Sequence, residues 1–231
     1  MKLHGVVFDI GQTLVDYSAP LSWAELYRAA FEETAEANGF ELNEEEAGHI
    51  IKVLTKYNTS DNPREEEVSS DVIFGELLEG TRIPAECLGR VKAAFFGFFS
   101  RSARVFPEAE EVLRQLSRRG IPTGTLSDVP YGMDNEFILK DLGQLCSLIT
   151  FPYTSNDIGL RKPNPAGLLL LAERMGVSVH DIAFVGDEDK DMECAKNAGA
   201  HAILMDRGGE WGDFGQEAAI KDLRELLELM E

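Results

Sequence analysis

The stretch that decides the fold is residues 4–16, HGVVFDIGQTLVD. A short apolar run, residues 6–8, leads directly to one carboxylate, Asp9, and Gly11 stands two residues further on. An unbroken apolar run of this length is typical of a strand that is buried on both faces in a parallel sheet. Ligands of such sheets bind outside the carboxyl ends of the strands, so Asp9 is a candidate functional residue.

Composition narrows the class of protein. The chain has 231 residues and a formal net charge of −19, which argues against a nucleic-acid or anionic-membrane surface. The three cysteines, Cys87, Cys146 and Cys194, are far apart and form no CxxC pair, which favours reduced thiols. With no signal-peptide pattern and no apolar stretch of about 18 residues, we expect a cytoplasmic protein.

Residues 18–102 predict helices only. The first follows a capping-box pattern at residues 22–25, the second follows Asn43, the third covers residues 70–79 and the fourth begins near Pro84. The Phe-rich stretch 95–99 is expected in the core of this region and not on a dimer face. The acidic runs 44–46 and 65–67 are expected on solvated faces or at helix N-termini.

From Pro107 onward, predicted helices and strands alternate. The pattern predicts strands over 121–126, 148–151, 182–185 and 201–205, and helices over 108–119, 133–142, 164–175, the stretch that ends at 197–199, and 218–230. Such alternation indicates a mainly parallel sheet. We therefore predict an α/β fold: a Rossmann-like three-layer core (1–17 and 103–231) with an inserted all-helical cap domain (18–102).

Polar side chains collect at the predicted strand ends. Asp9 ends the first strand, Ser127 and Asp128 end another, and Asp187 ends a third, with Glu188, Asp189 and Asp191 close behind it. Lys162, in GLRKPNP, precedes the helix that leads to this third strand, and Arg161 beside it is expected to face solvent. Carboxylates grouped in this way suit Mg²⁺ and not zinc, which favours His and Cys. The four histidines are scattered without ligand spacing and are expected to be structural or on the surface.

Four stretches, in order, resemble the motifs of the haloacid dehalogenase-like superfamily, which consists mostly of Mg²⁺-dependent phosphatases. VVFDIGQTLVD is similar to its first motif, GTLSD to its second, IGLRKPNP to its third and IAFVGDEDKDMECAKNAGA to its fourth. The resemblance covers nearly the whole chain, and each motif stands at a predicted strand end or helix start. The region 18–102 then corresponds to the helical cap that many members insert after the first strand.

The resemblance implies a role for each of these residues. Asp9 would be the nucleophile that forms an aspartyl-phosphate, and Lys162 would balance the charge of nucleophile and phosphoryl group. Ser127 and the backbone N–H of Asp128 would hold phosphoryl oxygens. The Mg²⁺ ligands would be Asp9, the carbonyl of Gly11 and Asp187, with Asp191 as an indirect partner and Asp189 as a weaker substitute for it. Thr13 would fix the turn through its hydroxyl. The substrate would be a small phosphorylated metabolite.

Gly11 departs from the family pattern. Phosphatases of this family usually carry at this position a second aspartate, which protonates the leaving oxygen and then activates water. The Thr13-Leu14 pair fixes the register, and the amide of Gln12 has no useful proton to give. Metal binding should survive, since the family uses a main-chain carbonyl here, but acid–base catalysis should suffer by roughly 10²–10⁴-fold.

Several functions are therefore open. The first is a slow or specialised phosphohydrolase whose leaving group needs no acid or finds one in the cap. The second is a catalytically weak or inactive protein that binds a phospholigand or a metal. The third is a metal-independent 2-haloacid dehalogenase, because halide leaves without protonation, although VGDEDKD is typical of a metal site. Phosphonate cleavage would need a cap lysine such as Lys52 or Lys56.

Substrate choice should depend on the cap, because a cap closes over the strand ends and excludes water. The loop 39–43 and the hinges near 16–20 and 101–104 are the predicted specificity segments.

Overall fold

A six-stranded parallel sheet forms the core of the computed structural model, which describes residues 1–17, 23–209 and 212–230. The strand order is β5-β4-β1-β6-β7-β8, and every neighbouring pair is parallel. The strands are β1 (Gly5–Phe8), β4 (Thr123–Ser127), β5 (Phe151–Thr154), β6 (Ile182–Gly186), β7 (His201–Met205) and β8 (Ala218–Ile220). The predicted α/β class is confirmed, and β1 lies at the centre, where the strand order reverses.

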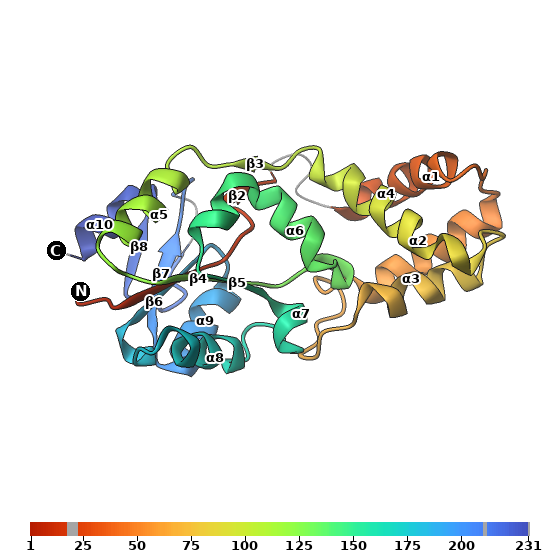
Figure 1. Cartoon of the computed structure of the whole chain (residues 1–231). Coiled ribbons are helices and arrows are strands. Elements are labelled where there is room, and N and C mark those ends of the chain that lie inside the picture. The colour runs from red at the N-terminus through yellow and green to blue at the C-terminus, as the bar shows by residue number, and fades with distance from the viewer. Residues whose placement is uncertain (18–22, 210–211, 231) are drawn as a thin grey trace.

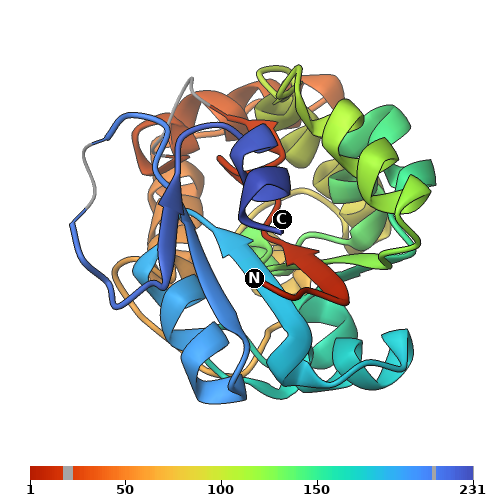
Figure 2. The same ribbon diagram turned by 90° about the vertical axis from the view of Figure 1, so that its left-hand side faces the viewer.

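Helices cover both faces of the sheet, as Figures 1 and 2 show. On one face lie α5 (Ala109–Arg118) and α10 (Arg224–Leu229), and on the other lie α8 (Ala166–Met175) and α9 (Asp189–Ala198). Val6 and Phe8 of β1 pack into the apolar cluster on the first face, and Val7 packs into the cluster on the second. All three are fully buried, which explains why the strand is an apolar run without alternation.

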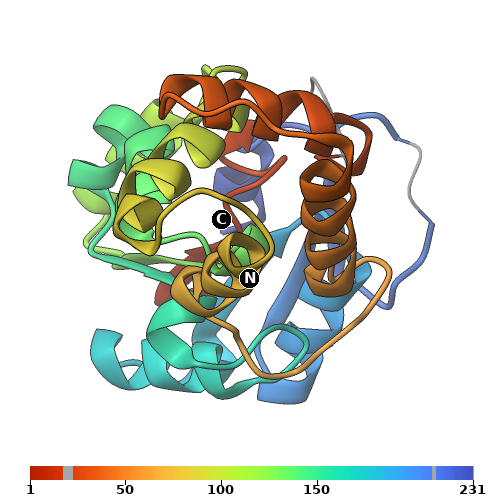
Figure 3. The ribbon, with the colours of Figure 1, turned by 90° about the vertical axis from the view of Figure 1, so that its right-hand side faces the viewer.

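The cap consists of four packed helices at the end of the molecule opposite both termini (Figure 1). After a 3₁₀ turn, η1 (Trp23–Leu26), come α1 (Tyr27–Ala37), α2 (Glu44–Tyr57), α3 (Ser70–Glu79), η2 (Ala85–Cys87) and α4 (Leu88–Ser100). Figure 3 shows these helices in front of the core. Phe95 and Phe96 are fully buried and Phe99 is nearly so, which confirms the Phe-rich stretch as cap core.

The chain crosses between core and cap at a small antiparallel sheet. It is formed by β2 (Val15–Asp16) and β3 (Arg104–Val105), with Val15 opposite Val105. The crossing out and the crossing back are therefore hydrogen-bonded to each other. On this pairing we propose that the cap is bounded at residues 17/18 and 102/103.

Two predicted elements need correction, and one predicted helix cap lies outside the described residues. The stretch 218–230 is not one helix: residues 218–220 form β8 beside β7, and only 224–229 are helical, because β7 offers an open edge to this apolar segment. Strand β5 begins three residues later than predicted. Ser22 of the expected capping box lies outside the described residues, and α1 begins at Tyr27 without a side-chain cap.

The remaining elements connect the strands. They are α6 (Asn135–Leu142), α7 (Ser155–Ile158) and the 3₁₀ turns η3 (Pro130–Gly132), η4 (Gly143–Leu148) and η5 (Val179–Asp181). All three cysteines are free thiols, as predicted. Within the described ranges, no helix is both long and apolar enough to cross a membrane.

Candidate active site

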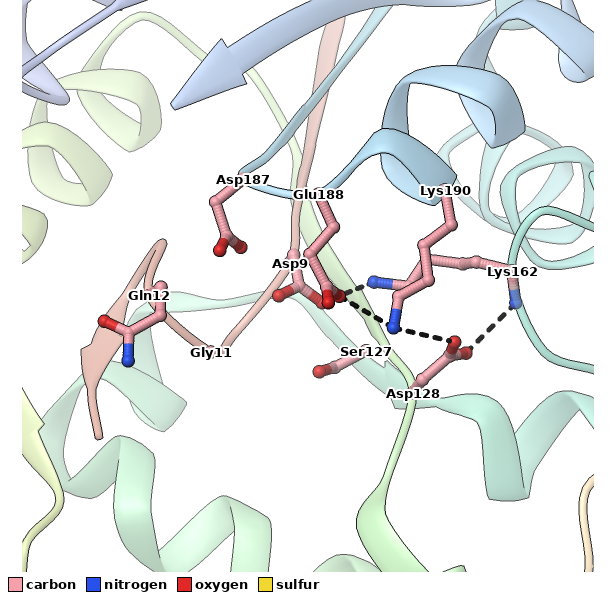
Figure 4. A pocket seen from close by; sticks show the side chains of 9 residues that line it. All are labelled: Asp9, Gly11, Gln12, Ser127, Asp128, Lys162, Asp187, Glu188 and Lys190. Atoms are coloured by element: carbon pink, nitrogen blue, oxygen red, sulfur yellow. Dashed lines mark hydrogen bonds and ion pairs between the residues drawn. The ribbon is translucent and has the colours of Figure 1, made fainter. Parts of the chain in front are cut away.

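The ends of the three central strands bring the predicted residues together. Asp9 follows β1, and its backbone N–H donates to Val185 O of β6 at 2.8 Å. Ser127 is the last residue of β4, and Asp187 directly follows β6. Figure 4 shows their side chains around a common space. This pocket has a volume of about 180 Å³ and is lined by Asp9, Gly11, Gln12, Ser127, Asp128, Lys162, Asp187, Glu188 and Lys190.

Lys162 is the buried cation of the site. Its Nζ lies 2.6 Å from Asp9 Oδ1 and 2.6 Å from Asp191 Oδ1. Burial lowers the pKa of Lys162, but the charges of Asp191 and Asp9 outweigh it and hold that pKa well above its usual value. The ammonium group is thus fixed in its charged form between two carboxylates.

Asp191 is fully buried in the first turn of α9, behind the pocket wall. Its Oδ2 accepts from the backbone N–H of Glu188 at 3.0 Å, which closes a capping box at the start of this helix. Its other oxygen faces Lys162. Asp191 therefore has a structural partner for each oxygen, in keeping with an indirect position at a metal site.

The carboxylates of Asp9, Asp187 and Asp191 form an acidic cluster in which one oxygen of each lies within 4.8 Å of the others. Burial, together with the charges of Asp9 and Asp191, raises the pKa of Asp187 to about 8. Burial also raises the pKa of Asp191 to about 6, and the charge of Asp9 adds to this although Lys162 opposes it. The cluster holds more negative charge than Lys162 balances, and its all-oxygen donors fit a hard divalent cation such as Mg²⁺.

The turn after β1 carries Gly11 and Gln12. Gln12 has a φ of 52°, in the left-handed region, and the backbone N–H of Thr13 donates to Gly11 O at 2.6 Å. The predicted role of the Thr13 hydroxyl is wrong: among the described residues this buried group has no hydrogen-bond partner. The turn is fixed by backbone bonds instead.

Arg207, just after β7, also holds this turn and was not predicted. Its guanidinium donates to Thr13 O at 2.9 Å and to Gln12 O at 3.3 Å, and it pairs with Glu108 at 2.6 Å. It also lies 3.4 Å from the centre of the Phe106 ring. Its place at the carboxyl end of a strand was the one available sequence signal.

Two further residues line the pocket: Lys190, which was not predicted, and Glu188, which was named among the carboxylates near Asp187 but given no role. Lys190 Nζ lies 2.7 Å from Glu188 Oε2 and 3.7 Å from Asp128 Oδ2, so a second cation stands at the pocket rim. Asp128 Oδ1 accepts from the backbone N–H of Lys162 at 3.0 Å, which ties the second predicted motif to the third. Their positions in GDEDKD were the signal that could have identified them.

Arg161 does not face solvent, contrary to the prediction. Its side chain is 5% exposed, pairs with Glu67 and donates to Val129 O at 2.9 Å. Glu67, from the acidic run expected on a solvated face, is 3% exposed in its side chain and also accepts from Ser155 Oγ at 2.5 Å. The two errors have one cause, since each buried charge neutralises the other.

A larger cavity of about 710 Å³ extends from this pocket toward the cap. Its floor includes Gly11, Ser127 and Asp187, and its walls include the segment 57–61 after α2. The loop 39–43, predicted as a specificity segment, contributes residues 39–42 to a separate pocket with Glu46, Arg82 and Ile83. The turn after α2 covers the site instead, because it is the end of that helix that reaches the core.

Gly11 has room for a side chain. A Cβ atom placed there would lie 3.9 Å from Asp9 Oδ2 and 4.0 Å from Tyr17 Cδ2, which are ordinary contacts. The backbone does not require glycine here, since the positive φ of this turn belongs to Gln12. The absence of an acid at position 11 is therefore not forced by packing.

Comparison with known proteins agrees with this geometry. The chain is 28% identical over 218 residues to phosphoglycolate phosphatase of Escherichia coli (strain K12), covering 91% of this chain and 84% of that protein. Among solved structures it is similar to a 2-haloacid dehalogenase from Pseudomonas syringae pv. Tomato DC3000, at a TM-score of 0.70 and 23% identity, covering 99% and 98% of the two chains. It is also similar to the HAD-hydrolase YfnB from Bacillus subtilis bound to magnesium, at a TM-score of 0.64 and 16% identity, covering both chains entirely.

The family follows from the match along the chain. Residues 3–199 match the sequence profile of the haloacid dehalogenase-like hydrolases. That range contains the helical cap, the strand ends that carry Asp9, Ser127 and Asp187, and the loop before α8 that carries Lys162. The chain belongs to the haloacid dehalogenase-like hydrolase family.

Proposed function

We propose that this protein is a Mg²⁺-dependent phosphohydrolase that acts on a small phosphorylated metabolite through an aspartyl-phosphate at Asp9. The observation that carries this is the cluster of Asp9, Asp187 and Asp191, whose oxygens lie within 4.8 Å of one another, together with the buried cation Lys162 paired to Asp9 and Asp191. An acidic pocket of this kind accepts a phosphate dianion only when a metal ion reverses its local charge. The 28% identity to phosphoglycolate phosphatase supports the same reaction class.

Asp9, the Gly11 carbonyl and Asp187 would hold the ion, with Asp191 acting through Lys162 and the start of α9. Bound Mg²⁺ would supply charge neutralisation of the phosphoryl oxygens. Ser127 Oγ and the backbone N–H of Asp128 would donate to those oxygens. Lys162 would hold the Asp9 carboxylate in position and lower the repulsion between it and the incoming phosphoryl group.

The reaction divides into two displacements at phosphorus. An Asp9 carboxylate oxygen attacks the phosphorus, and the bond to the ester oxygen breaks, leaving its electron pair on that oxygen. Water then attacks the aspartyl-phosphate, the bond between phosphorus and Asp9 breaks, and inorganic phosphate leaves with the carboxylate restored. Gly11 supplies no proton to the leaving oxygen and accepts none from water, so we propose that both steps are slowed for leaving groups that need an acid.

The test is hydrolysis of acetyl phosphate and p-nitrophenyl phosphate, whose leaving groups need no acid. We expect phosphate release that requires Mg²⁺ and stops in Asp9→Asn, with phosphorylated Asp9 found by mass spectrometry in the wild type. An inert wild type in which Gly11→Asp restores turnover would instead establish the second function, a protein that binds a phospholigand without processing it.

A 2-haloacid dehalogenase is the other candidate, and Gly11 favours it because halide departs unprotonated. Asp9 would then attack carbon, and water would hydrolyse the resulting ester. The acidic triad argues against it, since this chemistry needs no metal. Halide release from a 2-haloacid in the presence of EDTA, together with no phosphate release from acetyl phosphate or p-nitrophenyl phosphate, would overturn our proposal in favour of the dehalogenase.

A further inference from the structure

The cavity above the catalytic pocket is much larger than a phosphate group needs. It has about 710 Å³, against about 180 Å³ for the pocket around Asp9, and the two share Gly11, Ser127 and Asp187. A cavity of this size is typical of sites that enclose a whole small molecule. The part beyond the phosphate must therefore receive the leaving group.

Aromatic side chains from both the cap and the core line this cavity, namely Tyr17, Trp23, Tyr57 and Tyr131. The rings of Trp23 and Tyr131 stack on each other with centroids 5.8 Å apart, and Tyr57 lines the cavity from the end of α2. The Trp23 ring is itself held by stacking on Phe99 at 3.8 Å. Flat, fixed rings contact a planar apolar group over a large area at little cost in conformational entropy.

The charge of the cavity beyond the catalytic pocket is negative. Among the described residues that line it, Asp61 and Asp141 carry charge and no lysine or arginine is present. Asp141 is a hydrogen-bond acceptor, from Tyr17 Oη at 2.9 Å and Ser100 Oγ at 3.1 Å. A leaving group with its own carboxylate, such as glycolate, would meet like charges here without a partner.

The missing acid points to the same kind of leaving group. Phenols resemble the tyrosine side chain, with a pKa of about 10. Aliphatic alcohols are about as weakly acidic as water, whose pKa is about 16. A phenolate thus leaves without a proton far more readily than an alkoxide, and neither Gly11 nor the Gln12 amide could provide that proton.

Resting on the proposed phosphohydrolase function, we propose that the substrate is an aryl phosphate: a phosphate monoester of a phenol-like group that is uncharged or cationic. In the first step the bond between phosphorus and the phenolic oxygen breaks, the electron pair stays on that oxygen, and solvent protonates the released phenolate. The aromatic rings of Trp23, Tyr57 and Tyr131 hold the leaving group, and position 11 needs no acid.

Phenyl phosphate and cyclohexyl phosphate test this, because they match in size and differ in leaving-group acidity. The constant kcat/KM reports the steps up to release of the leaving group, so slow hydrolysis of the aspartyl-phosphate does not mask the difference. In the wild type we expect a preference for phenyl phosphate of at least about 10²-fold. Gly11→Asp should raise kcat/KM for cyclohexyl phosphate by roughly 10²–10⁴-fold and narrow the gap, whereas the isosteric Gly11→Asn should not.

Other outcomes overturn the proposal in recognisable ways. Equal kcat/KM for the two esters would mean that another acid is present. A loss of cyclohexyl phosphate turnover in Asp141→Asn relative to the wild type would identify Asp141 as that acid. Acetyl phosphate separates the two levels of inference. If it is hydrolysed and both ring esters are inert, the aryl specificity fails and the phosphohydrolase stands; if it is inert as well, the proposed function itself fails.

The charge argument has its own test. Asp61 is exposed on the loop after α2, so Asp61→Lys places a cation at the cavity wall without disturbing the core. We expect it to lower KM for phosphoglycolate by roughly two- to fivefold, since an exposed ion pair contributes up to about 1 kcal/mol. Glu36→Lys, an exposed position on α1 outside the cavity lining, makes the same change in net charge and should leave KM unchanged. A wild-type protein that prefers phosphoglycolate to phenyl phosphate would contradict the proposal.

Discussion

At the scale of single residues, the buried ammonium group of Lys162 balances the charge of two buried carboxylates. Its side chain is 2% exposed and lies 2.6 Å from carboxylates of both Asp9 and Asp191. Replacing it by the similarly sized methionine leaves two buried carboxylates without their partner. We expect Lys162→Met to lower the free energy of unfolding of the metal-free protein by about 3–5 kcal/mol, measured by urea denaturation.

Lys190→Met is the matched control for this prediction. Lys190 is 31% exposed in its side chain and its closest partner, Glu188, is 50% exposed, so solvent screens the pair. We expect a change within about 1 kcal/mol. An equal decrease in the free energy of unfolding in the two variants would show that Lys162 does not neutralise the buried carboxylates.

At the scale of elements, the start of α2 is held by a carboxylate that also binds a second segment. Glu46 closes the capping box with Asn43 and accepts from the Arg82 side chain at 2.8 Å, which lowers the pKa of Glu46 to about 2. A lowered pKa means that the folded state favours the charged form. The stabilisation is complete above the usual value of 4.5 and is lost as the pH falls toward 2.

We therefore expect Glu46→Gln to flatten the pH dependence of stability between about 4.5 and 2, measured by thermal unfolding across that range. Glu45→Gln, one residue earlier on the exposed side of the same turn, is the control. If both variants keep the wild-type pH profile, the ion pair with Arg82 does not stabilise the cap.

Glu67 of the cap and Arg161 of the core form a buried ion pair that joins the two parts of the molecule. Their side chains are 3% and 5% exposed. Glu67→Gln leaves the Arg161 charge buried without its closest carboxylate, at a cost of about 3–5 kcal/mol. Arg161→Met leaves Glu67 paired with Arg64 at 3.2 Å, so we expect a smaller loss. The double variant should lose less than the sum of the two, with a coupling of about 0.5–3 kcal/mol. Strict additivity in urea denaturation would show that the two side chains act independently.

At the scale of the whole molecule, the net charge of −19 and the acidic cluster make two separate predictions about ions. Any added salt should stabilise the protein by screening its self-repulsion. Mg²⁺ should stabilise it further by binding only the folded state, by about 2.7 kcal/mol at a concentration 100 times its Kd. Melting temperatures in MgCl₂ and in NaCl of equal ionic strength separate the two effects.

Asp187→Asn should abolish the Mg²⁺-specific part and keep the screening part. Asp189→Asn removes the same charge from an exposed position two residues away and should keep both. A Mg²⁺-specific gain that survives Asp187→Asn would place the ion elsewhere on the chain.

The sequence by itself determined the parallel core, the helical cap and the strand-end residues of the site. Each of these is encoded locally. Buried strands are short apolar runs, and the apolar residues of a helix recur every 3.6 residues. The carboxyl ends of parallel strands meet at one edge of the sheet whatever the details of packing. That is why Asp9, Ser127 and Asp187 could be expected in one pocket. Lys162 lies on the loop before α8, and its motif, not a strand end, led to its prediction there. The exceptions, such as β8 within an expected helix, arose where a short segment pairs with a strand edge.

Only the tertiary structure decided which distant residues support that site. Arg207 holds the turn of Gln12 from 195 residues away, and Arg161 is buried against Glu67 from 94 residues away. Local sequence patterns predict that such charged side chains face solvent, because the opposite charge that neutralises them when they are buried lies on another segment. The position of residues 57–61 over the site was likewise decided only by the tertiary structure. It follows from how the cap packs on the core, which no local sequence pattern encodes.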